Sequence, residues 1–415
     1  MKIVLLVLLS LVVSPVHAAQ WLPNPLRVAQ AIGAQPEVQA ARARLDAARA
    51  QARARAVGPH EVTASAIVQQ RNVDEAEGGR GYREYEVQVG RAFRLPGKVA
   101  LDRSIGELGV LAAELRLDDA RHQAARRLLD GWTAWLRADA QRRELDAQLQ
   151  ALRREHAALG RRVQVGDAAQ KDLDLLGVDL AQAEAQHLAA SSAVDVARQA
   201  LTTDFPSLPL PARVPEVTVP QPLTEPAEVW ARRIVERSHE IAALEADAAQ
   251  ADALAARSRA DRFADPTIGL RLMNDRGGAE QALGVVVSVP IGGRYRSATA
   301  AAESAAAAAL HGDAAALHRD IRREAERSVE AVRVRYAQWQ AQRRAWDASQ
   351  AASQRVHRGW QLGELPLSDW LMAERMQRQI ALNETEARIA AEEARLRVLV
   401  DSHELWHDRR PPDFE

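Results

Sequence analysis

The sequence predicts a mainly helical protein with a small β part, built from two internal repeats that each run helix, β-hairpin, long helix, turn and helix. Three observations predict this fold class. Hydrophobic residues make up 47% of the chain, many of them alanine, but aromatic residues only 4%, which is typical of long, closely packed helices. Two short motifs recur at a nearly constant offset. A proline-rich segment separates the two copies.

Residues 1–18 have the pattern of a secretory signal peptide, with Lys2 before an apolar run and a small-x-small site at 16–18. We expect the mature chain to lie outside the cytoplasm. The apolar run is too short to span a bilayer, and no later segment offers about 20 consecutive apolar residues. The chain has no cysteine and a net charge of -1, so we expect no disulfide, no lipid-anchor cysteine and no nucleic-acid partner.

The first element of each repeat that stands out is an interrupted helix. The segment "WQLGELPLSD" at 360–369 holds Gly363 and Pro366, which disfavour a helix interior, yet helix-forming sequence follows at once. The segment "VQVGDAAQKD" at 163–172 matches it 197 positions earlier. We therefore expect 163–172 and 360–369 to be the tips of two helical hairpins.

The second recurring motif joins a strand to a helix. "RAFRLPGKV" at 91–99 matches "VSVPIGGRY" at 287–295, 196 positions later, which predicts strand-to-helix joints at Pro96 and Gly97 and at Gly292 and Gly293. Between the copies, residues 205–226 hold seven of the eighteen prolines and read as an extended linker. We assign 19–204 to the first structural repeat, 227–402 to the second and 403–415 to a C-terminal tail.

Within the first repeat we expect a helix over 26–57, strands at about 60–70 and 82–95, and a helix over 98–162 about 95 Å long. The second repeat is expected to place its strands at about 266–274 and 281–291. The far half of the long helix spaces apolar residues by four and three, as a coiled-coil seam does. These residues include Leu145, Leu149, Leu152 and Leu159.

The strands alternate between apolar and polar residues. In 82–95, Tyr85, Val87 and Val89 share one face, and Glu84, Glu86 and Gln88 share the other. Transmembrane barrels need such amphipathic strands of about 9–11 residues, but a half-buried soluble sheet has the same pattern. Arg91 lies on the apolar face, so we place it near a membrane interface.

The order and duplication of the joints, the Gly-x5-Asp turns and the strand pairs resemble the TolC-type outer-membrane efflux proteins, over residues 24–402. The resemblance implies a homotrimer in outer-membrane lipid, in which three chains form a 12-stranded β-barrel that continues into a periplasmic α-helical barrel. It implies as partners a periplasmic adaptor (membrane fusion) protein and an inner-membrane efflux pump of the resistance-nodulation-division type. The chain would be a passive exit duct without cofactor or enzymatic activity. A lone four-stranded sheet would leave open edges in lipid, which also requires oligomerisation.

The resemblance also assigns roles to the hairpin tips. It places Asp172, Asp369 and Trp360 at the periplasmic entrance, where each Asp would form a ring of three. The alternative for the aspartates is a helix-start carboxylate favoured by the helix dipole. Leu365 stands where the best-known members have an Arg that ties the entrance closed, and Trp360 where they have a Tyr, so the closing interaction differs here. The residues expected to contact the adaptor are Val165, Gly166, Leu362, Gly363, Glu364 and Leu365.

The substrate is less defined. The joint "FRLPGKVALDR" resembles the branch of the family that serves heavy-metal cation pumps for cobalt, zinc and cadmium, so we favour metal cations over organic compounds. A periplasmic coiled-coil adaptor or scaffold without a barrel is the alternative from a different functional class. It would be expected to have one helical hairpin, whereas this chain has two.

One further motif is "HELWH" at 403–407, which matches the H-E-x-x-H zinc signature. Only eight residues follow, which leaves no room for a third ligand and a cleft beyond the motif. We therefore predict no metal ligands and interpret the motif as a polar helix end, with incidental metal affinity as the lesser alternative.

Overall fold

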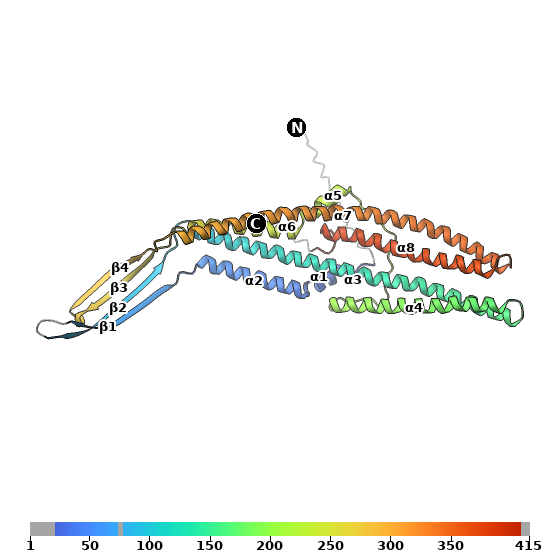
Figure 1. Cartoon of the computed structure of the whole chain (residues 1–415), viewed down its shortest axis with the longest axis horizontal. Coiled ribbons are helices and arrows are strands. Elements are labelled where there is room, and N and C mark those ends of the chain that lie inside the picture. The colour runs from blue at the N-terminus through green and yellow to red at the C-terminus, as the bar shows by residue number, and fades with distance from the viewer. Residues whose placement is uncertain (1–20, 74–77, 408–415) are drawn as a thin grey trace, which may run out of the picture.

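The computed structural model describes residues 21–73 and 78–407, and the expected signal peptide lies outside this range. The molecule is elongated (Figure 1). A small sheet forms one end, two helical hairpins form the other end, and the short helices lie between them. The expected mainly helical fold with a small β part is confirmed.

Both halves of the chain have the same order of long elements. The first half contains α1 (Pro25–Gly33), α2 (Pro36–Val57), β1 (Val62–Val73), β2 (Arg80–Ala92), α3 (Lys98–Gln164) and α4 (Gln170–Asp204). The second contains α5 (Ala227–Glu236), α6 (His239–Ala260), β3 (Thr267–Asp275), the 3-10 turn η1 (Arg276–Gly278), β4 (Glu280–Ser288), α7 (Arg294–Gln361) and α8 (Leu367–Asp401). The helices α3 and α7 have 67 and 68 residues, so each is about 100 Å long.

Some boundaries differ from the sequence-based expectations. The helix expected over 26–57 is two helices, because Pro36 starts α2 at the position where its missing N–H costs nothing. β2 ends at Ala92 and not at 95, since the N–H of Leu95 donates to the Asp265 carboxylate (3.0 Å). β4 ends at Ser288, two residues before Pro290, which has no N–H for a sheet ladder.

The four strands form one antiparallel sheet in the order β1-β2-β3-β4. The register places Ala66, Val87, Leu272 and Leu283 in one row across the sheet, and the neighbouring row on the same face holds Ala64, Val89, Leu270 and Val285. These side chains remain exposed in the single chain, with Leu283 76% accessible. Within the described residues, β1 and β4 each pair along one edge only.

The opposite face of the sheet is polar and carries ion pairs. Arg271 donates to Glu86 (2.7 Å), and Arg71 lies 2.7 Å from Glu84. Arg91 lies on the apolar face, but near the end of β2 that leads into the helices, where it donates to the carbonyl of His60 (2.9 Å). Among the described helices, none is both long enough and apolar enough to cross a membrane.

Two hydrophobic clusters hold the helices together. The larger lies in the middle of the molecule and combines α1, α2, α3, α4, α5, α7 and α8 with the proline-rich segment, which contributes Phe205, Leu208 and Val217. The smaller joins the two hairpins towards their tips and contains Leu149, Leu152, Leu159, Leu176, Ala183, Leu367, Trp370 and Leu371. Because the second cluster draws residues from both hairpins, the hairpins are packed against each other and not splayed apart.

Candidate functional site: the hairpin tips and the strand-to-helix joint

The first tip, after α3, reverses the chain through a Schellman motif. The N–H of Gly166 donates to the carbonyl of Val163 (3.0 Å), and the N–H of Asp167 donates to that of Arg162 (2.8 Å). Gly166 has φ 79°, the left-handed conformation that such a motif needs and glycine adopts without strain. The glycine therefore serves chain reversal.

The second tip, after α7, repeats these bonds. Gly363 donates to Trp360 (3.0 Å) and Glu364 donates to Gly359 (2.9 Å), with Gly363 at φ 77°. The two tips thus share one local geometry at matching positions of the two halves. In each, the residue before the glycine is apolar and largely exposed.

These exposed residues are Val165, 79% accessible, and Leu362, 65% accessible. Leu365 instead turns back onto the helix, since its Cδ1 lies 2.8 Å from where a Cβ on Gly359 would stand. Leu365 therefore packs on its own tip, where the resemblance leads one to expect a polar Arg. The protruding apolar side chains of the tips are Val165 and Leu362.

The two aspartates of the tips occupy the third position of their helices, Asp172 in α4 and Asp369 in α8. The helix dipole favours an acidic side chain there. Asp369 is exposed and Asp172 is half-buried. The first turns of α4 and α8, which contain the two aspartates, lie at the same end of the molecule (Figure 1).

Trp360 packs sideways within its own hairpin. Its ring stacks on Trp370 with centroids 4.6 Å apart, and His357 stacks on Trp370 at 5.0 Å. The ring is half-buried. In the single chain Trp360 therefore joins α7 to α8 beside the tip, a packing role that the sequence reasoning did not consider.

An ion pair between the hairpins escaped the sequence reasoning. The buried carboxylate of Asp179 in α4 accepts from Arg375 in α8 (2.8 and 3.2 Å to Oδ1), with Arg378 at 3.8 Å. Asp179 and Arg375 are 196 positions apart, close to the repeat offset. No local pattern relates the two residues, because the offset of 197 between the tips matches Asp179 to Met376 and not to Arg375.

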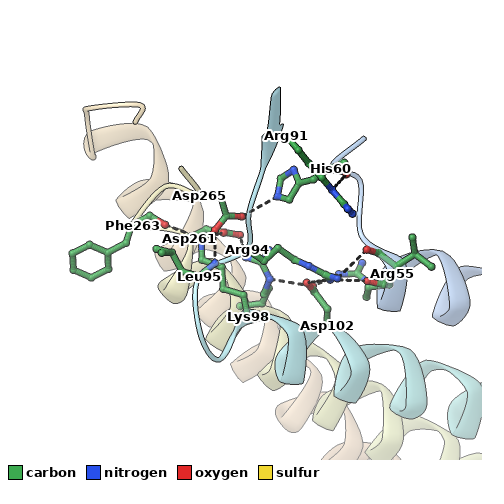
Figure 2. A network of polar contacts seen from close by, with 12 residues as sticks. Arg55, His60, Arg91, Arg94, Leu95, Lys98, Asp102, Asp261, Phe263 and Asp265 are labelled. Carbon is green, nitrogen blue, oxygen red and sulfur yellow. Dashed lines mark hydrogen bonds and ion pairs between the residues drawn. The ribbon is translucent and has the colours of Figure 1, made fainter. Parts of the chain in front are cut away.

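At the other end of the long helices lies a network of charged groups (Figure 2). Lys98, the first residue of α3 after the left-handed Gly97, is only 1% accessible. Its Nζ donates to Asp265 (2.7 Å) and to the carbonyl of Phe263 (2.7 Å), and lies 2.9 Å from Asp261. A buried ammonium is costly unless it is paired in this way. The network therefore fixes the first turn of α3 against the residues that lead into β3.

Arg94, in the turn before Pro96, binds the end of α2. Its guanidinium donates to the carbonyls of Ala56 (2.7 Å) and Val57 (2.9 Å), and also to Asp102 (3.0 Å). These are the last carbonyls of α2, which have no partner within the helix. Gly58 is needed here, because a Cβ on it would stand 2.7 Å from the Arg94 guanidinium carbon.

The second joint is open by comparison. Gly292 has φ 138°, and Gly292, Gly293 and Arg294 are all exposed in the single chain. Arg294, at the position that matches Lys98, is therefore not buried as Lys98 is. The two predicted joints share their place in the chain but not their surroundings.

Electrostatics at the first joint favour the charged form of Asp265. Burial alone would raise its pKa, but hydrogen bonds from Lys98, the Leu95 N–H and His60 outweigh that effect and lower the pKa to about 2. The ordinary value is 3.8. Because the folded-state pKa is depressed, the ionised carboxylate stabilises the fold above pH 4, and that contribution is lost as the pH falls through about 2.

We expect Asp265→Asn to lower the free energy of unfolding at pH 7 by about 2 kcal/mol, which is the free energy that corresponds to the depressed pKa of Asp265. The difference from the wild type should shrink between pH 4 and pH 2. Thermal unfolding of the purified protein in detergent, followed by circular dichroism at each pH, measures both effects. Asp313→Asn, on an exposed position of α7, is the control. A loss that is equally large at pH 2 would contradict the assignment.

No protein-family model matches the chain, and comparison with curated proteins finds no relative. Solved structures do match. CusC, whose crystal structures concern transmembrane channel formation, superposes with a TM-score of 0.73 at 16% identity, over 91% of this chain and 91% of that one. The outer membrane protein VceC of Vibrio cholerae gives 0.71 at 18%, over 91% and 95%. The open-state outer membrane channel MtrE of Neisseria gonorrhoeae gives 0.68 at 17%, over 91% and 88%.

At such identities the comparison establishes the fold. It confirms, at that level, the resemblance that the joints, turns and strand pairs carried in the sequence. The chain has the fold of the TolC-type outer-membrane channels.

Proposed function

We propose that the chain is the outer-membrane exit duct of a tripartite efflux system, which passively conducts substrate from an inner-membrane pump and a periplasmic adaptor to the outside. In this proposal three chains each contribute four strands to a 12-stranded barrel. Their helices form a periplasmic tube. The protein acts as a conduit and not as an enzyme.

The observation that carries the proposal is the two-faced sheet. One face is apolar and exposed in the single chain, whereas the other is polar and holds the Arg271–Glu86 ion pair. A soluble sheet would bury its apolar face against helices, but here the helices continue away from the end of the sheet (Figure 1). In a barrel, the apolar face would contact lipid and the polar face would contact water. Pairing of β4 with β1 of the next chain would give the backbone groups of both edge strands hydrogen-bond partners.

The hairpin tips support a partner at the far end. Val165 and Leu362 present apolar side chains at matching points of the two tips, and such side chains at a protruding end are suited to contact with another protein. We assign the adaptor contact to the two tips, with Gly166, Gly363 and Glu364 shaping the surface. The ring of Asp172 and Asp369 around the entrance would attract cations.

For the substrate we favour heavy-metal cations, on the resemblance of the "FRLPGKVALDR" joint alone. Organic-compound efflux is the alternative, because a duct leaves the choice of cargo to its pump. A periplasmic adaptor or scaffold is disfavoured, since it would leave the apolar face of the sheet in water.

A charge on the apolar face of the sheet should block assembly in the outer membrane. We expect Leu283→Lys to reduce the trimer in outer-membrane fractions, because a Lys at mid-bilayer depth costs about 2–4 kcal/mol per chain. Its neighbour Ala282 points to the polar face, so Ala282→Lys is the matched control and should assemble normally. Membrane fractionation and unheated gel electrophoresis measure the outcome. A soluble periplasmic monomer, indifferent to both changes, would rule out the duct.

Neutralising the entrance ring should change ion conduction. Asp369→Asn removes three charges from the trimer, so we expect lower cation selectivity and weaker block by divalent cations in planar bilayers. Asp172→Asn should act in the same direction. Asp174→Asn is the control, because Asp174 lies two residues further along α4 and therefore points to the other side of that helix. If Asp369→Asn leaves selectivity unchanged but lowers stability by about 1 kcal/mol, the residue is only a helix-start carboxylate.

The cargo can be tested in cells. If the duct serves a metal pump, deletion of the gene should sensitise cells to cobalt, zinc or cadmium more than to dyes and detergents. Growth inhibition by both classes of compound, with complementation by the wild-type gene, is the measurement. Greater sensitivity to dyes and detergents would favour the organic-compound alternative.

A further inference from the structure

The end of α8 has an unusual residue in a familiar turn. The N–H of His403 donates to Val400 (3.0 Å) and that of Glu404 to Leu399 (2.8 Å), the same Schellman bonds as at the hairpin tips. However, His403 stands in the left-handed position, with φ 58°, where both tips have glycine. A side chain in this conformation is strained, and strain of this kind is concentrated at functional sites. His403 is therefore a candidate for a role other than chain reversal.

The turn brings three histidines together. α8 ends at Asp401, so the "HELWH" motif is not helical, and the chain folds His407 back until its ring stacks on His403 at 4.4 Å. His239, the first residue of α6, stacks on His403 at 4.6 Å and on His407 at 5.4 Å. One nitrogen from each of the three rings lies within 4.8 Å of the other two. The third histidine thus comes from a distant part of the chain.

The two inner rings are suited to act as ligands. His239 Nε2 is buried and has no hydrogen-bond partner within the described residues, and His403 is only 7% accessible. The Nε2 nitrogen of His239 is therefore available to a ligand.

The surroundings suit a cation. A cavity of about 80 Å³ beside His239 and His403 is also lined by a fourth histidine, His122, and by Asp119, Glu240 and Asp401, while His407 lies outside its lining. The acidic groups on this side would offset the charge of a metal ion. Arg126 lines it as well and lies 3.4 Å from Asp401. The cavity has room for water as a further ligand.

We propose that His239, His403 and His407 form a binding site for one divalent transition-metal cation of the zinc and copper class. Three imidazoles are a ligand set that suits these ions. A tetrahedral zinc site, with Zn–N distances of about 2.0–2.1 Å, needs its nitrogens about 3.3 Å apart. The rings are stacked in this structure, with interplanar angles of 19° for His239 and His403 and 9° for His403 and His407, so their in-plane lone pairs do not yet converge. Binding therefore requires the rings to turn as well as to close, and of the three only His407 is exposed to solvent.

The bound ion would fasten the segment after α8 to the start of α6, in the middle of the molecule. Its role is to hold two parts of the chain together and not to catalyse a reaction, because the motif lacks the helical arrangement of a zinc protease. The site belongs to the single chain. It therefore does not depend on the proposed duct or on the nature of its cargo.

The experiment uses the full mature protein, purified in detergent without a histidine tag and stripped with a chelator. Titration calorimetry with Zn²⁺ and with Cu²⁺ should show one tight site per chain. His239→Gln and His407→Gln should each weaken Zn²⁺ affinity at least tenfold. His318→Gln, on an exposed position of α7, is the matched control and should leave it unchanged. In Asp369→Asn, which lacks a carboxylate at the hairpin tips, the tight Zn²⁺ site should remain and only weaker Zn²⁺ binding at the tips should be lost.

Absence of a tight site in the wild type would overturn the proposal, as would equal affinities in the wild type and His407→Gln. His407→Gln is the decisive variant, because the residue is exposed and its replacement should leave folding intact, which circular dichroism checks. The absorption spectrum of bound Co²⁺ gives a second readout. It should show the intense bands of a four-coordinate ion in the wild type and lose them in His239→Gln. The six-coordinate spectrum of Co²⁺ in the wild type would count against the site.

Discussion

The pairing of the buried Lys98 ammonium with Asp265 is the interaction on which the rest of the structure depends. Lys98 starts the long helix of the first half, and Asp265 lies just before β3, the first strand of the second half. The contact therefore fixes how the two halves meet where strands become helices (Figure 2). Asp102 extends the network by accepting from Arg94 and from Arg257 of α6. An ammonium in this position without its carboxylates would be buried and unpaired, which is costly, so the pairing stabilises this arrangement of the joint.

Corresponding elements of the two halves make different side-chain contacts. Gly166 and Gly363 keep one geometry, because chain reversal after a helix has few solutions. Lys98 and Arg294 have diverged, with the first buried among partners and the second exposed. Asp179 of α4 and Arg375 of α8 form an ion pair, so that each half provides one partner. The two halves thus share backbone geometry at their turns and differ in the chemistry of their side chains.

Local signals in the sequence were enough for the fold but not for its contacts. Gly363 and Pro366 mark a hairpin, and the alternation of Val87 and Glu86 marks a two-faced strand, because each depends on residues close in the chain. The break before Pro36 and the early end of β2 were missed, the latter because Leu95 bonds a carboxylate 170 positions away. His239 was missed for the same reason, since no local pattern relates it to "HELWH". Such contacts depend on how helices align in space, which spacing along one helix does not record.

Because α3 and α7 are long and uninterrupted, a movement at the joint is transmitted to the distant tips. A continuous helix is stiff over its whole length, so rotation at one end is carried to the other with little loss. For a helix of about 100 Å, a tilt of about 5° at the joint would displace the tip by about 9 Å. The charged groups around Lys98 lie at the end of α3 about which such a tilt would occur. A small adjustment of their geometry would be enough to change how far apart the distant ends stand.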